Sequence, residues 1–214
     1  ELRDLMPSAE EEAVRKAERL ERKNVYVLRF EPYRDALKNL LDAFPRDLPI
    51  PVANPKKKIN EETLISFTIP GRTALVELKC MGDECVLRVL SASIEDLAET
   101  AAKIRQYLDS EEIISSVIES RSEGPVDRKT ANVLVDKIRR LLRKTKKARE
   151  IAIWLEVLAA LLRRLKGGKK YADRLIEFSS EILNLYIVGK EMMSSDVEKA
   201  EHILKEISVF LEGG

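Results

Sequence analysis

Lysine and arginine side chains dominate one stretch of the sequence, and the chemistry open to them is the neutralisation of anions. Residues 128–149, RKTANVLVDKIRRLLRKTKKAR, contain ten basic residues and a single acid, Asp136. Phosphate groups are the commonest large anionic partner of such a surface, and each neutralised phosphate releases counterions, so that binding becomes steeply salt-dependent. The stretch therefore predicts contact with a phosphate backbone.

The same stretch has the apolar spacing of a helix, which decides how the charges are presented. The apolar residues fall within one arc about 100° wide, enough to pack on a core; they are Ala131, Leu134, Val135, Ile138, Leu141 and Leu142. Like charges three and four residues apart repel one another on the opposite side, so a nearly acid-free face indicates a site for an anion. We expect this face to contain Lys137, Arg139, Arg140, Arg143, Lys144, Lys146 and Lys147, and to be extended beside a Gly-Gly turn by Arg163, Arg164, Lys166, Lys169 and Lys170.

Charge segregation along the chain leaves a second hypothesis open. Residues 1–127 hold 19 basic and 25 acidic side chains, residues 128–174 hold 16 and 4, and residues 175–214 hold 3 and 8. The basic segment can therefore neutralise acidic surfaces of its own chain or of a second subunit instead of phosphates. An exposed contiguous basic patch would favour nucleic acid, whereas basic residues paired with Asp or Glu would favour protein assembly.

Side chains suited to recognising nucleic-acid bases are scarce in this sequence. Aromatic residues make up only 5% of the chain, which argues against a base-stacking surface, and there is no paired Cys/His zinc-finger spacing. Any nucleic-acid binding, to DNA or RNA, is therefore expected to contact backbone or shape. The run Lys56, Lys57 and Lys58 offers a second contact, although a solvated loop tip is the ordinary interpretation.

Two cysteines define the next candidate site. Cys80 and Cys85 flank MGDE, and no further cysteine exists to complete a four-ligand zinc site. If the flanking strands form a hairpin, the two cysteines face each other within reach of a disulfide. Free thiols are expected in a cytosolic mesophile, and a disulfide is plausible in a hyperthermophile.

Groups for catalysis are not apparent in the sequence. His202 is the only histidine and lies among acids on a helical pattern, where a surface position is expected. Adjacent carboxylates such as Glu95 and Asp96 point apart on a helix and do not form an acid/base pair. No phosphate loop or dinucleotide fingerprint is present. We therefore predict a non-enzymatic protein without a metal or cofactor.

Strand and helix patterns alternate in the first half of the chain. A charged helix is predicted over 8–23, a proline-rich, partly extended loop over 45–60, and a short helix over 110–120. Strands are predicted over 24–30, 63–70, 73–80 and 85–92, and helices over 33–44 and 93–108, with Ser93 as N-cap. The last three strands are expected to form an antiparallel meander.

The second half of the chain reads as helix throughout. Helices are predicted over 128–149, 151–166, 170–189 and 195–212, with the first two alternatively forming one long rod, and Ser195 and Glu198 as a capping box for the last. We predict an α+β fold: a charged N-terminal helix in 1–23, a small antiparallel-sheet module with packed helices in 24–122, and an all-α helical bundle in 123–214. The boundary is placed at RSEGPVD.

Composition suggests the setting of the protein. Charged residues make up 35% of the chain, and Gln and His occur once each, a usage typical of thermophile-like and archaeal-like proteins. The N-terminal residues show no secretory signal, and the longest apolar run, 151–162, is shorter than the roughly 20 residues of a membrane span. We expect a cytoplasmic protein with no membrane partner, whose partner is a nucleic acid or an acidic protein, including a second copy of itself.

Overall fold

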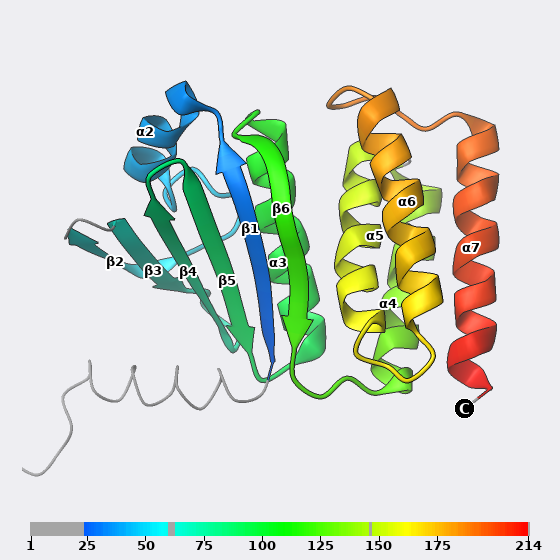
Figure 1. Ribbon diagram of the computed structural model, residues 1–214. Helices are drawn as coiled ribbons and strands as arrows, with labels where there is room; N and C mark the ends of the chain where they lie inside the picture. Colours follow the sequence, from blue (N-terminus) through cyan, green and yellow to red (C-terminus); the bar gives the residue numbers. More distant parts are fainter. Residues whose placement is uncertain (1–23, 60–62, 146, 214) are drawn as a thin grey trace, which may run out of the picture.

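The computed structural model describes residues 24–213 except for 60–62 and 146, and the helix predicted over 8–23 lies outside these residues. The described part of the chain forms an antiparallel sheet with helices, followed by a bundle of helices (Figure 1). The order is β1 (Val25–Pro32), α2 (Arg34–Ala43), β2 (Ala53–Ile59), β3 (Thr63–Thr68), β4 (Ala74–Met81), β5 (Glu84–Ser91), α3 (Ile94–Ser110), β6 (Ile114–Glu123), α4 (Arg128–Lys144), α5 (Ala148–Leu162), α6 (Lys169–Leu185) and α7 (Ser194–Glu212). The predicted α+β class is confirmed.

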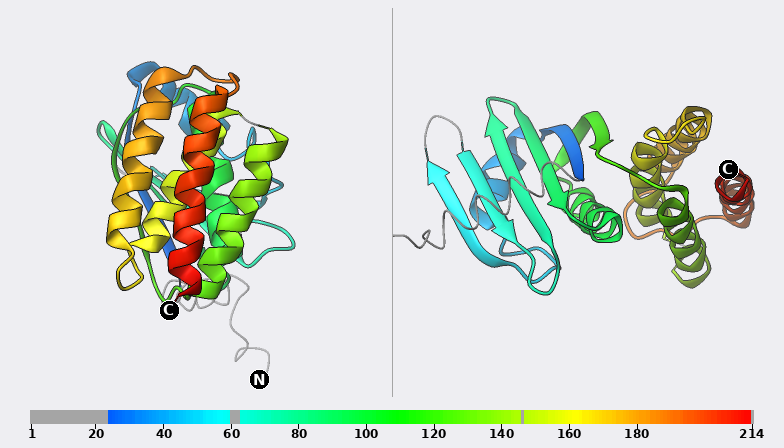
Figure 2. Two further views of the ribbon diagram at one scale, coloured as in Figure 1. Left: turned by 90° about the vertical axis from the view of Figure 1, so that its right-hand side faces the viewer. Right: turned by 90° about the horizontal axis from the view of Figure 1, so that it is seen from below.

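The sheet has the strand order β2-β3-β4-β5-β1-β6, and every neighbouring pair is antiparallel. β3, β4 and β5 form the predicted meander. α3 packs on β1, β4 and β5 and also contacts α4 and α5, so this one helix belongs to both halves of the molecule (Figure 2). It begins at the predicted N-cap, where the Ser93 hydroxyl accepts a hydrogen bond from the Asp96 amide.

β1 lies between β5 and β6, and its sequence suits a central strand. Its first four residues, VYVL, are all buried, because both faces of the strand are covered. Tyr26, Leu28 and Phe30 face the main core, whereas Val25 and Val27 pack with Leu90 on the opposite face. β5 pairs with one edge of β1, and β6 pairs with the other.

The prediction of a short helix over residues 110–120 is wrong, because most of these residues belong to strand β6. Ile113, Ile114, Val117 and Ile118 have a spacing that fits one side of a helix, but the chain instead pairs with β1 from Ile114 to Glu123. β-branched residues suit a strand as well as a buried helix, and the free edge of β1 decides between the two. Glu112, with a φ of 52°, turns the chain out of α3 into this strand.

The prediction of a loop over residues 45–60 is wrong for its second half, which forms strand β2. Ala53–Ile59 pairs with β3, although the segment contains Pro55. β2 is an edge strand with one neighbour, and its pairing is interrupted between Ala53 and Lys56, where Pro55 lies. Proline is tolerated at such a bulge because no partner there requires its missing N–H group. The lysines of residues 56–58 therefore belong to a strand, and Lys56 is exposed.

Cys80 and Cys85 lie directly opposite each other on β4 and β5, and their sulfur atoms are bonded. The disulfide considered from their spacing is therefore present in the structure. Both cysteines are buried, with 6% and 0% of their surfaces exposed. The bond closes the tight hairpin turn at Gly82 and adds a covalent link to two strands that already pair along eight residues.

Reduction of this disulfide is expected to lower the free energy of unfolding by about 2 kcal/mol, because a loop of only about six residues constrains the unfolded chain weakly. Urea unfolding with and without dithiothreitol measures this loss. The C80A/C85A variant is the control, since its unfolding midpoint must not respond to dithiothreitol. Equal midpoints for the wild-type protein under both conditions would contradict the prediction.

α5 is the central helix of the C-terminal half. All but three of its fifteen residues are buried, because it packs against α3, α4, α6 and β6. The core consequently runs without interruption from the sheet into the bundle. The division of the chain into modules 24–122 and 123–214 stays a prediction, since β6 runs to Glu123 and the core is shared between the two halves.

Two details of the bundle differ from expectation. α4 ends at Lys144 and α5 begins at Ala148, whose amide donates to the Lys190 carbonyl, so the alternative of one long rod is wrong. α7 begins at Ser194 with Met193 as its N-cap and no side-chain cap, so the capping box at Ser195 does not form. α7 packs between α4 and α6 (Figure 2).

Candidate functional site: a basic groove between two helices

α4 presents its charges as the helical spacing predicts. Asp127 caps the helix by accepting a hydrogen bond from the Thr130 amide at 2.7 Å. The residues predicted to pack on the core are buried, apart from the half-buried Leu141. The basic residues therefore project on the other sides of the helix, where they separate into two groups with different neighbours.

One group lies towards α7. Arg143 forms an ion pair with Glu201 of α7, at 3.8 Å, and Arg139 lies one turn earlier on the same side. Arg139 is half-buried, and its Nε atom has no hydrogen-bond partner among the described residues. Arg139 is therefore partly shielded by burial, and the charge of Arg143 is partly balanced by Glu201.

The second group faces α3 and lines a groove, here called the α3–α4 groove. Its volume is about 480 Å³, and it is lined by Glu95, Glu99, Lys103, Gln106, Val133, Leu134, Lys137, Arg140, Leu141, Lys144, Glu150 and Trp154. Lys137, Arg140 and Lys144 come from the predicted basic face, and Lys103 joins them from α3. Arg140 and Lys144 are exposed and form no ion pair with any described residue. Four cations therefore gather on one groove, beside three acids.

Glu99 is the most strongly bound acid of this groove. Its carboxylate lies 2.9 Å from Arg72 Nη2, 3.0 Å from Lys103 Nζ and 3.1 Å from Lys137 Nζ. The hydrogen bond from Arg72, with those from the two lysines, lowers the pKa of Glu99 to about 2 even though partial burial acts in the opposite direction. Lys103 and Glu99 were missed in the sequence, where their spacing of four residues on one helix was the only signal.

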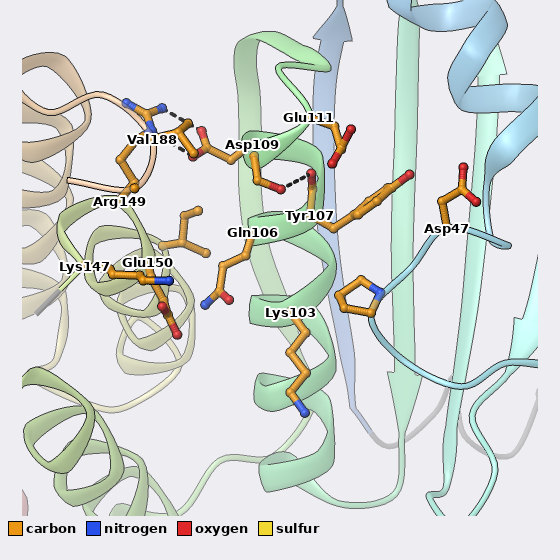
Figure 3. Close-up of a pocket in the computed structure, with 14 residues that line it drawn as sticks. Asp47, Lys103, Gln106, Tyr107, Asp109, Glu111, Lys147, Arg149, Glu150 and Val188 are labelled. Carbon is orange, nitrogen blue, oxygen red and sulfur yellow. Dashed lines mark hydrogen bonds and ion pairs between the residues drawn. The ribbon is translucent and has the colours of Figure 1, made fainter. Parts of the chain in front are cut away.

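The groove continues along α3 towards the start of α5, where it becomes the α3–α5 groove, with a volume of about 520 Å³. Lys103, Gln106 and Glu150 line both parts. Figure 3 shows Gln106 between α3 and the pair Lys147 and Glu150. Lys147 is exposed and forms no ion pair with any described residue, so it extends the row of cations beyond Lys144.

Arg149 also lines the α3–α5 groove but is fully engaged. Its Nε and Nη2 atoms donate to the two carboxylate oxygens of Asp109 at 2.8 and 2.6 Å (Figure 3). Its Nη1 atom donates to the carbonyls of Leu183 and Tyr186 at 2.6 and 2.9 Å. The hydrogen bond to Asp109 raises the pKa of Arg149 above its ordinary value. This arginine therefore supports the wall of the groove and does not offer an anion site.

A buried ionic pair lies beneath the groove. Arg105 of α3 is 3% exposed, and its Nε atom lies 3.6 Å from Oε2 of Glu156 on α5. Burial raises the pKa of Glu156, and the Arg105 charge opposes that rise. Tyr26 lies nearby; burial raises its pKa to about 12, and its hydroxyl hydrogen-bonds to Ser120 at 2.8 Å. The pair has no access to a ligand and joins the sheet side to the bundle.

The remaining predicted basic residues lie at the other end of the bundle. α5, from Ala148 to Leu162, carries the chain about 22 Å along the bundle axis (Figure 1). Arg163 and Lys169 both approach Asp173, at 3.1 and 3.9 Å, whereas Arg164 and Lys170 form no ion pair with any described residue. The structure does not bring this cluster together with Lys137, Arg140 and Lys144. Lys146 lies outside the described residues.

The groups that could carry other chemistry are dispersed. His202 is exposed on α7 as predicted, and its Nε2 atom lies 3.0 Å from Glu206. Within residues 24–213, apart from the undescribed positions, no three His, Cys, Asp or Glu side chains are arranged to hold a metal ion. Among the same residues, no helix combines the length and the apolar character needed to cross a membrane. The basic groove is the site that the described side chains define best.

Comparison of the chain with protein-family models, with curated proteins and with solved structures finds no match. The fold and the groove define an α+β protein whose candidate site is a cationic cleft between helices.

Proposed function

We propose that the protein binds a nucleic acid through its phosphate backbone, which lies along the α3–α4 groove. The observation that carries the proposal is a row of three exposed cations without an acidic partner among the described residues: Arg140 and Lys144 line this groove, and Lys147 lines the adjoining α3–α5 groove. Lys103 stands on the facing wall of the groove. Because the helices already fix the backbone of these residues, binding to phosphates has to order only their side chains.

Recognition is expected to be independent of base sequence. Trp154, at the floor of the groove, is 5% exposed, and Lys137 Nζ lies 5.4 Å from the centre of its ring. The ring is therefore not free to stack on a base, so the backbone supplies the contacts. Three to four neutralised phosphates predict that affinity falls by about 20- to 150-fold between about 50 and 200 mM salt.

The test compares two variants with the same change in net charge. R140E/K144E alters the groove, and R164E/K170E alters the opposite end of the bundle; all four residues are exposed and form no ion pair with a described residue. Fluorescence anisotropy with single-stranded and duplex DNA and RNA is expected to show more than about 10-fold weaker binding for the groove variant only. Circular dichroism first establishes that both variants fold.

Three other outcomes would count against the proposal. Equal losses in the two variants would indicate a general field effect instead of a groove. A loss confined to R164E/K170E would place the contact at the α5–α6 end. No binding of the wild-type protein at about 50 mM salt would favour the assembly alternative, in which the basic helix docks on an acidic protein. The ion pairs that Lys137 and Arg143 already form within the chain are consistent with that alternative.

A further inference from the structure

Three cations from three different elements converge on the carboxylate of Glu99. Arg72 comes from the turn between β3 and β4, Lys103 from α3 and Lys137 from α4. The Glu99 side chain is 20% exposed, and it lines the α3–α4 groove together with the two lysines. A single carboxylate with three cationic partners leaves an excess of positive charge at this point of the groove.

The chemistry of this cluster matches that of a phosphate site. Carboxylate and phosphate oxygens accept the same charge-assisted hydrogen bonds from ammonium and guanidinium groups. The side chains of Lys103 and Lys137 are 41% and 40% exposed, so a ligand in the groove can reach both. Arg72 does not line the groove, and it can keep its hydrogen bond to Glu99 when a ligand is present.

We propose that Glu99 is an internal competitor of the ligand: it holds Lys103 and Lys137 in the free protein, and a ligand phosphate takes over these two lysines on binding. This inference rests on the proposed function, since it concerns the same groove. In this proposal Glu99 limits the affinity for the nucleic acid, whereas Arg140 and Lys144 contribute to that affinity. Removal of the Glu99 charge therefore strengthens binding.

The matched pair of variants is E99Q and E95Q. Glu95 lines the same groove, one turn earlier on α3, but it forms no ion pair with a described residue. Both variants remove one negative charge, so a difference between them reports the release of the lysines. E99Q is expected to bind a labelled 20-nucleotide single strand about 5- to 10-fold more tightly than the wild-type protein, and E95Q within about 2-fold of it. The plot of log affinity against log salt is expected to steepen by about 1 for E99Q, since up to two further phosphates are neutralised.

A second probe separates failure of this inference from failure of the proposed function. Inorganic tripolyphosphate, followed by isothermal titration calorimetry, tests the anion site without a nucleic acid. Tighter tripolyphosphate binding by E99Q than by E95Q supports the competitor role even if neither protein binds a nucleic acid. Equal affinities of the two variants for both probes overturn it, and then Glu99 only ties α3 to its neighbours. If E99Q fails to fold, E99D replaces it: the shortened carboxylate withdraws from Lys137, and unchanged affinity again overturns the inference.

Discussion

Replacement of Arg105 by Met is expected to lower the free energy of unfolding by about 3–5 kcal/mol, because it removes the ion-pair partner of the buried Glu156 carboxylate and leaves only the weaker field of Arg149. Arg105 is 3% exposed, and it approaches both Glu156 and Asp109, at 3.6 and 3.8 Å. The E156L variant is expected to lose a similar amount, since it leaves the arginine buried. Urea unfolding followed by circular dichroism measures both variants.

The double variant R105M/E156L distinguishes a broken pair from a damaged core. Two apolar side chains of similar volume remove both desolvation penalties, so most of the lost stability is expected to return. R174M is the matched control, because Arg174 pairs with Glu206 on the surface, with 42% and 41% of their side chains exposed. A surface pair of this kind contributes less than about 1 kcal/mol. A double variant as unstable as the two single variants combined would refute this account.

The loss of stability caused by R105M is expected to depend on pH in a defined direction. The pKa of Glu156 is already raised by burial, and loss of the opposing Arg105 charge raises it further. A carboxyl whose pKa is higher in the folded than in the unfolded state binds a proton more tightly when folded, so its unfavourable effect diminishes as the pH falls through the folded-state pKa. The stability gap between R105M and the wild-type protein is therefore expected to be smaller at pH 5 than at pH 8.

Local patterns in the sequence predicted the helices and the meander well. The apolar spacing of α4 placed Ala131, Leu134, Val135 and Ile138 on the core, where the structure has them buried. The Ser93 cap and the turn at Gly167 and Gly168 could also be predicted from the sequence, because each depends on a few adjacent residues. Such signals need no knowledge of the partner element.

The conformation of two strands could not be predicted from the sequence, because it depends on the strands with which they pair. β2 and β6 were missed because a proline and a helix-like spacing dominate their local patterns, while neighbouring strands determine their conformation. The groove was missed for a related reason. Lys103 is distant in sequence from Lys137, and only the packing of α3 beside α4 places them on one site. Helical periodicity likewise indicates which side of α4 is exposed, but not that Arg143 meets Glu201 of α7.

Replacement of Arg149 by Met is expected to cost about 3 kcal/mol or more of unfolding free energy, because it removes the guanidinium that donates to one nearly buried carboxylate and two carbonyls. Asp109 is the carboxylate, with 10% of its side chain exposed, and Leu183 and Tyr186 provide the carbonyls. Through these contacts Arg149 ties the end of α3 and the end of α6 to the start of α5. R149K is expected to lose less, since lysine keeps the charge but cannot donate to all these acceptors in the planar geometry of a guanidinium.

The effect of R149M is also expected to be local, and hydrogen exchange can show this. The last residue of α6, Leu185, and the segment between α6 and α7 carry exposed apolar side chains, those of Leu185, Ile187, Val188 and Met193. Their backbone is nevertheless fixed to α5 through Arg149 and the Lys190 carbonyl. R149M is expected to accelerate amide exchange at residues 183–193 far more than in β1, whose amides exchange through global unfolding. Because Val188 and Gly189 also wall the α3–α5 groove, the same variant is expected to loosen that end of the cleft. Uniform acceleration across the chain, or a loss below about 1 kcal/mol, would show that Arg149 does not hold this segment in place.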